Sequence, residues 1–142
     1  MGLQEGLIER RINEYFEAVD RLEIDPILDC FTVDAELTCV SDGRHARGHD
    51  ELRTFFNGVI DGSLEMKHAI TNLLVDAERG RAATEQDYHD RRSNGLVYDE
   101  RTCNFFEFDE SGKITRLRFW REGGSTRPKQ TFSDPPSSRG SC

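Results

Sequence analysis

Asp20 and His68 each interrupt an apolar stretch of the 142-residue chain, and together they could perform acid–base chemistry. Asp20 comes four residues after Phe16, beside the apolar stripe of a helical pattern, and His68 opens the stretch HAITNLLV. A neutral imidazole accepts a proton at one nitrogen only if the other nitrogen keeps its hydrogen. A carboxylate bound to that N–H fixes the tautomer and stabilises the imidazolium that forms. The pair therefore predicts a general base, which would remove a proton beside a leaving group or beside a carbonyl.

Other residues are candidates for binding the substrate of such a base. In the stretch TCNFFEF, Asn104 shares strand parity with Thr102 and Phe106, so these side chains are expected to point the same way. Tyr15 lies on the apolar stripe of the first helix and has a hydroxyl to place, and His89 lies on the neighbouring strand. Donors such as Asn104, Tyr15 or His89 could stabilise an oxygen that gains negative charge. We therefore predict Tyr15, His89, Asn104 and Phe106 as substrate-binding residues.

Each of these residues also has a purely structural interpretation. A histidine at the start of a strand, such as His68, is often a satisfied core or surface residue. A buried asparagine, such as Asn104, often ties down neighbouring backbone. His89 and Asp87 fit equally well on a solvated outer face of their strand.

The periodicity of the chain predicts the elements that would position these residues. Apolar side chains at helical spacing, from Ile8 to Val19, predict an amphipathic helix of about four turns. A short helix from Asp25-Pro26, a strand over 35–40 and a helix from about 49 to 61 follow. From Met66 onward, turns at 78–80, 94–95 and 109–112 separate four antiparallel strands. This order predicts an α+β fold, a cone in which a curved, mostly antiparallel sheet wraps around three N-terminal helices and encloses an apolar pocket.

Several segments resemble the NTF2-like, SnoaL-like superfamily over about residues 5–122. They are the two helices followed by DAEL, the stretch GHDELRTFF and the hairpin FDESGKITRLRFW. AVDRLEID, with Asp20, and KHAITNL, with His68, are similar to the segments that carry the Asp–His dyad in the scytalone dehydratase and γ-hexachlorocyclohexane dehydrochlorinase branch. TCN, with Asn104, is similar to the part of scytalone dehydratase that supplies a pocket Ser and Asn, and His89 falls near that enzyme's second pocket histidine. The resemblance implies a cofactor-independent lyase, isomerase or cyclase that acts on a small, mostly apolar molecule.

Departures from relatives narrow this expectation. The chain resembles ketosteroid isomerases at Tyr15, but Cys39 and Asn104 stand where those enzymes have their two acids, which disfavours steroid isomerisation. Val19 and Val40 occupy the places of the water-holding tyrosines of scytalone dehydratase, so that enzyme's own substrate is not implied. A non-catalytic ligand-binding or dimerisation module of the same fold is the alternative.

Composition excludes other classes of function. The net charge of −8 and the pI of about 5.0 disfavour nucleic acid and anionic membranes as partners. The N-terminal stretch has no signal-peptide pattern, and no segment reaches the ~20 apolar residues of a membrane span, so we expect a cytoplasmic protein. The cysteines show no zinc-site spacing and there is no glycine-rich phosphate loop, so we expect no metal and no cofactor.

The chain is expected to form one domain over residues 1–122, with a flexible tail at 123–142 that contains three of the four prolines. Cys103, Phe105 and Trp120 are expected on the outer face of the sheet. An exposed apolar patch of this kind is usually covered, which predicts a homodimer or a higher homo-oligomer.

Overall fold

The computed structural model of the chain describes residues 3–122, and the predicted tail at 123–142 lies outside these residues. The elements in chain order are α1 (Glu5–Asp20), α2 (Ile24–Asp29), β1 (Phe31–Cys39), β2 (Arg44–Arg47), α3 (Gly48–Ile60), β3 (Ser63–Asp76), β4 (Arg81–Arg92), β5 (Val97–Phe108) and β6 (Ile114–Arg121). Within residues 3–122, no helix combines the length and the hydropathy that a membrane crossing requires.

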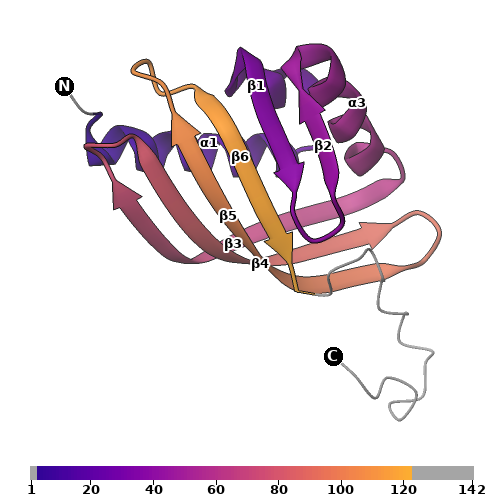
Figure 1. The fold of residues 1–142 in the computed structure, drawn as a ribbon. Coiled ribbons are helices and arrows are strands. Elements are labelled where there is room, and N and C mark those ends of the chain that lie inside the picture. The colour runs from indigo at the N-terminus through magenta and orange to yellow at the C-terminus, as the bar shows by residue number, and fades with distance from the viewer. Residues whose placement is uncertain (1–2, 123–142) are drawn as a thin grey trace.

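The strands form one six-stranded sheet in the order β2-β1-β6-β5-β4-β3. All neighbours pair antiparallel except β1 and β6, which pair in parallel. Figure 1 shows the sheet curving around α1, which packs against β3, while α3 packs against β1. The predicted α+β fold, with three helices and a curved, mostly antiparallel sheet, is confirmed.

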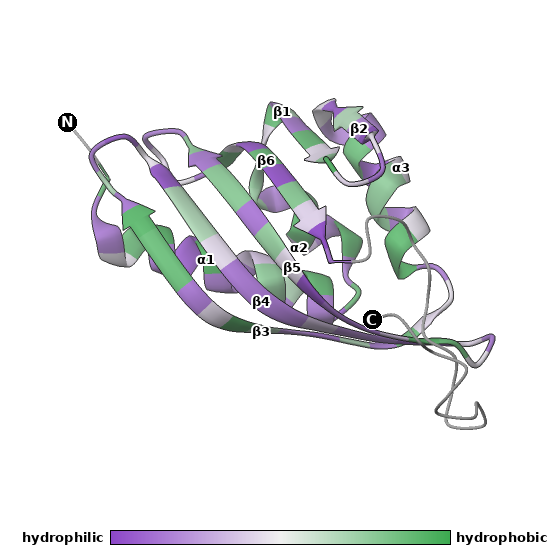
Figure 2. Cartoon of the chain, turned by 60° about the horizontal axis from the view of Figure 1, so that its bottom comes forward, coloured by the Kyte–Doolittle hydropathy of each residue, from purple (hydrophilic) through white to green (hydrophobic). Residues whose placement is uncertain are grey.

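Side-chain burial follows the periods that the sequence shows. In α1 the apolar stripe is buried, including Ile8, Ile12 and Phe16. Along β5, Thr102, Asn104, Phe106 and Phe108 are buried while their neighbours are more exposed, which confirms the predicted parity. Figure 2 shows the resulting mixture of hydrophobic and hydrophilic positions along the strands.

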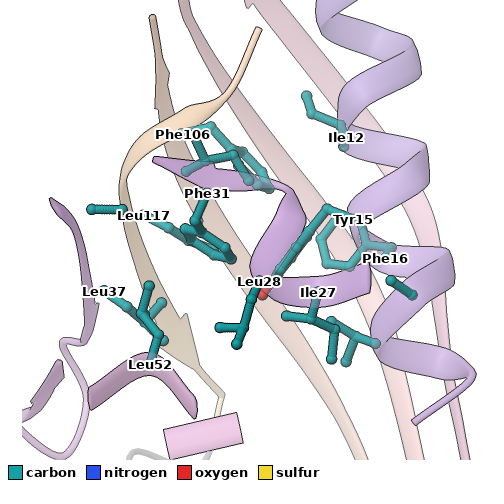
Figure 3. Packing of buried hydrophobic residues seen from close by; sticks show 14 of the residues in the cluster. Ile12, Tyr15, Phe16, Ile27, Leu28, Phe31, Leu37, Leu52, Phe106 and Leu117 are labelled. Atoms are coloured by element: carbon teal, nitrogen blue, oxygen red, sulfur yellow. The ribbon is translucent and has the colours of Figure 1, made fainter. Parts of the chain in front are cut away.

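The core between the helices and the inner face of the sheet is rich in aromatic rings. Figure 3 shows Tyr15 and Phe16 of α1 packed towards Phe31 and Phe106 from the sheet. The ring of Tyr15 meets those of Phe31 and Phe106 edge-on, with centroids 5.7 and 5.9 Å apart. Burying each such side chain contributes about 1.5–3 kcal/mol, so the core fixes α1 on the sheet.

The structure differs from the expected element list near the N-terminal half. The short strand β2 was not predicted, because among its residues only Ala46 is buried and the hydrophobic signal is therefore weak. It pairs with β1 across the turn that contains Gly43. Strand β1 begins at Phe31 rather than at residue 35, and α2 begins at Ile24, before the predicted start at Asp25-Pro26.

Candidate active site

The structure brings Asp20 and His68 into direct contact although they are 48 positions apart in the sequence. Oδ1 of Asp20 lies 2.6 Å from Nδ1 of His68. Oδ2 of the same carboxylate accepts a hydrogen bond of 3.0 Å from the backbone N–H of His68. Because a carboxylate only accepts hydrogen bonds, it holds the hydrogen of a neutral imidazole on Nδ1. Nε2 of His68 is then left with a free lone pair.

Two aromatic rings hold the imidazole in place. The centroid of the His68 ring lies 4.9 Å from that of Phe16 and 5.1 Å from that of Tyr88. The side chain of His68 is 11% exposed and that of Asp20 24% exposed. His68 lines the cavity and Asp20 does not, so the carboxylate lies behind the ring.

Asp20 occupies an unfavourable place for a carboxylate, the last residue of α1, where the helix dipole is negative and the last turn contains no basic residue. The helix ends there because Leu22 adopts a positive φ of 59°, which is uncommon for a bulky side chain. The backbone N–H of Leu22 bonds to the carbonyl of Val19 at 2.9 Å and closes the helix end. Helix propensity therefore does not explain Asp20, whereas its two hydrogen bonds to His68 do.

His68 opens onto a cavity of about 160 Å³ that lies between α1, α3 and the sheet. The apolar side chains in its wall include Phe16, Val19, Phe55, Phe56, Val59, Met66 and Phe119. An apolar cavity of about 150 Å³ can hold benzene, so this space suits a small molecule with a ring.

Two of the predicted binding residues, Tyr15 and Asn104, line this cavity. Burial in the first place, and then the charges of Cys30 and Asp20, raise the pKa of Tyr15 above its ordinary value. The Tyr15 hydroxyl therefore stays protonated and can act as a neutral donor. Asn104 is 4% exposed and takes part in a buried hydrogen-bond network on β4 and β5.

The structure places His89 and Phe106 elsewhere than predicted. His89 belongs to the outer face of β4, where it pairs with Asp99 at 2.8 Å, because the inward parity on this strand runs through Gln86 and Tyr88. It does not line the cavity. Phe106 is 1% exposed and packs in the core behind Phe16, with centroids 6.0 Å apart, so it supports the cavity without reaching it.

A buried carboxylate in the cavity wall, Asp90, was not predicted from the sequence; it is 1% exposed. Three groups donate to it: the hydroxyl of Ser63 at 2.6 Å, the hydroxyl of Tyr88 at 3.0 Å and the guanidinium of Arg92 at 3.0 Å. Arg92 also donates to backbone carbonyls at the end of α3 and just after it. Next to it Gly62 has a φ of +83°, and a Cβ there would lie 3.2 Å from Nη2 of Arg92. Tyr88, Asp90 and Arg92 of this cluster line the cavity.

A second missed feature is the ion pair of Arg121 and Glu100, whose side chains are 8% and 7% exposed. The two bonds are each 3.0 Å long, in the bidentate geometry that arginine and carboxylate favour. The guanidinium lies 5.7 Å from the ring centroid of Tyr88 and 5.4 Å from that of Tyr98. The sequence contains little indication of this buried ion pair, because Glu100 and Arg121 belong to polar strand ends, which are expected to be exposed to solvent.

Metal-ligating side chains do not gather in the described part of the chain. Within residues 3–122, no three His, Cys, Asp or Glu side chains lie close enough together to hold a metal ion. Several polar groups that line the cavity are instead paired: His68 with Asp20, Arg92 with Asp90 and Arg121 with Glu100.

Comparison with known proteins gives one family and a consistent set of folds. The SnoaL-like domain matches residues 12–117 of the chain. No curated protein matches the chain in sequence. The fold is similar to that of SalBIII, described as an epoxide hydrolase/cyclase-like enzyme in pyran ring formation in the polyether salinomycin, with 20% identity over 83% of this chain and 92% of that chain and a TM-score of 0.74.

Two further solved structures share the fold. One is a provisionally named SnoaL-like polyketide cyclase from Shewanella denitrificans OS-217, with 14% identity, coverage of 82% of this chain and 90% of that chain, and a TM-score of 0.73. The other is a LEH-like epoxide hydrolase of M. tuberculosis, with 19% identity, coverage of 83% and 84%, and a TM-score of 0.70.

Proposed function

Because the chain belongs to the SnoaL-like family, we propose that it is a cofactor-independent enzyme of the cyclase or isomerase type, with Asp20 and His68 as its general base. The observation that carries the proposal is the 2.6 Å hydrogen bond between Oδ1 of Asp20 and Nδ1 of His68. It directs the free lone pair of Nε2 away from the carboxylate, on a ring that lines a mostly apolar cavity. A small, mostly apolar molecule is the proposed substrate.

The proposed reaction begins with proton transfer from carbon to Nε2 of His68. Asp20 stabilises the imidazolium that forms, and Tyr15 and Asn104 donate hydrogen bonds to the oxygen that gains charge. The resulting enolate either takes back the proton at another carbon, which is an isomerisation, or attacks an electrophile in the same molecule, which closes a ring. SalBIII, with its epoxide hydrolase/cyclase-like description, supports ring closure by analogy of fold. Elimination of a leaving group by the same base is the alternative that the dehydratase-like segments of the sequence favour.

Hydrogen–deuterium exchange tests the proposed base without knowledge of the natural substrate. The protein is incubated in D₂O with a panel of small cyclic and aryl ketones, and deuterium incorporation next to the carbonyl is followed by NMR. We expect the wild-type protein to accelerate exchange of the ketones that fit the cavity, and His68→Ala to lose that acceleration. His89→Ala is the matched control, because His89 also pairs with an aspartate but lies outside the cavity. Ketones that bind without any exchange would indicate a ligand-binding module instead.

We also propose that the chain forms a homodimer through the outer face of β5 and β6. Phe105 is 43% exposed there and its ring lies 5.5 Å from that of Trp120, with Arg118 over both rings. We expect sedimentation velocity to give a dimer for the wild type and a monomer for Phe105→Lys. Val33→Lys, on the exposed side of β1, should leave the dimer intact. A monomeric wild type at tens of micromolar would contradict the proposal.

A further inference from the structure

Four polar side chains form a hydrogen-bonded chain across the inner face of β4 and β5. Thr84 and Gln86 come from β4, and Thr102 and Asn104 are their register partners on β5. Gln86 is fully buried at 0% exposure, and Thr84 is 1% exposed. The hydroxyl of Thr84 donates to Oε1 of Gln86 at 2.7 Å. Nε2 of Gln86 in turn donates to Oγ1 of Thr102 and to Oδ1 of Asn104.

The direction of these hydrogen bonds determines which polar groups of the four side chains face the cavity. Gln86 uses both of its amide hydrogens on Thr102 and Asn104, so the amide oxygen of Asn104 is engaged and its NH₂ group is not. Within residues 3–122, no residue accepts a hydrogen bond from Nδ2 of Asn104. Every fully buried side-chain nitrogen or oxygen atom in these residues has a partner, so Nδ2 of Asn104 is not fully buried. Because Asn104 lines the cavity, this NH₂ group is accessible from it. The same reasoning leaves the hydroxyl proton of Thr102 free to donate.

We infer that Gln86 is a positioning residue that makes this wall of the cavity a two-donor site for one ligand oxygen. Asn104 and Thr102 supply the donors, and a carbonyl, enolate or phenolate oxygen is the matching group. If Gln86 were turned round, Asn104 would present its oxygen instead and the site would select a donor. The orientation of one buried amide thus sets the polarity of the site.

This inference rests on the proposed function for one step only, the identity of the reacting carbon. His68 lies on β3 and Asn104 on β5, with β4 between them in the same sheet, so the acceptor nitrogen and the two donors line one cavity from strands two apart. A carbonyl compound bound by its oxygen at Asn104 and Thr102 would offer an adjacent C–H bond to Nε2 of His68. That bond breaks, the proton goes to Nε2 and the electron pair moves onto the oxygen that the donors hold. The substrate class is therefore a small ketone or a related carbonyl compound with an acidic C–H next to the carbonyl.

Binding of 4-nitrophenol tests the donor site independently of turnover, because its phenolate is an oxyanion whose absorbance differs from that of the phenol. Nitrobenzene serves as a probe of similar shape that lacks the phenolic oxygen. We expect the wild type to bind the phenolate more tightly than nitrobenzene. Asn104→Asp keeps an oxygen that accepts from Gln86 but replaces the NH₂ group that would donate to the ligand. Gln86→Met removes the hydrogen bond that orients the Asn104 amide. Each should weaken phenolate binding by about tenfold or more, since hydrogen bonds to charged groups are strong, while nitrobenzene binding stays within about twofold.

Two further measurements keep the test decisive if a variant folds poorly. In the unmutated protein, the side-chain NH₂ resonances of Asn104 should move downfield when the phenolate binds. Asp87→Asn, an acid–amide exchange on the outer face next to Gln86, should leave phenolate binding unchanged. Unmoved Asn104 resonances, or an affinity that Gln86→Met does not alter, would overturn the inference.

One additional variant, His68→Ala, separates the role of His68 from that of the two-donor site. Phenolate binding that persists in His68→Ala but is lost in Asn104→Asp supports the two-donor site, even if the exchange assay finds no general base. Phenolate binding that is lost in His68→Ala and kept in Gln86→Met would show that the imidazole holds the anion, and would refute the two-donor site while leaving the proposed base intact.

Discussion

Replacing Asp20 with Asn, or His68 with Ala, is expected to lower the rate of carbon-acid exchange by about 10²–10⁴-fold, the usual contribution of a general base. His68→Ala removes the group that accepts the proton. Asp20→Asn keeps the shape of the side chain but loses the charge that stabilises the imidazolium, next to which it lies at 2.6 Å. The rate constant is measured by NMR in D₂O with the ketone that exchanges fastest.

The double variant separates a catalytic pair from two structural residues. Because the two side chains act as a unit, the double variant should be little slower than either single variant. The exposed pair of His89 and Asp99 provides matched controls, and His89→Ala and Asp99→Asn should leave the rate unchanged. Loss of thermal stability with unchanged exchange per folded molecule would instead assign Asp20 and His68 a structural role.

Replacing Asp90 with Ala is expected to lower the free energy of unfolding by about 3–5 kcal/mol, the range found when one partner of a buried ion pair is removed. Asp90 is 1% exposed, and it accepts hydrogen bonds from Ser63, Tyr88 and Arg92. Without the carboxylate, the guanidinium of Arg92 remains at the cavity wall with a side chain only 19% exposed. Urea unfolding followed by circular dichroism measures the change.

Asp99→Ala is the control for this prediction, because it also removes an aspartate that is paired with a neighbour. Its side chain is 55% exposed, and exposed ion pairs contribute only about 0–1 kcal/mol. A loss of stability in Asp90→Ala no larger than in Asp99→Ala would show that the cluster around Asp90 does not stabilise the fold.

Strong periodic patterns allowed the sequence by itself to determine the layout of the fold. The apolar stripe of α1 places Phe16 in the core and Asp20 at the end of that helix. The alternation in β5 assigns Asn104 to the same buried face as Phe106. Such predictions succeed because one face of each element is clearly apolar, so the period alone decides which side chains are buried.

Which face of β4 turns towards the core was decided only by the tertiary structure. Its sequence, RAATEQDYHDRR, carries polar residues at both parities, so no apolar face indicates which side turns inward. Pairing with β5 sets Gln86 opposite Thr102 and turns Gln86 and Asp90 inward and His89 outward. A shift of one residue would have exchanged the two sets of side chains, because successive residues of a strand point to opposite faces. Buried polar residues such as Gln86 and Asp90 are stable there only because partners distant in sequence, Asn104 and Ser63, complete their hydrogen bonds.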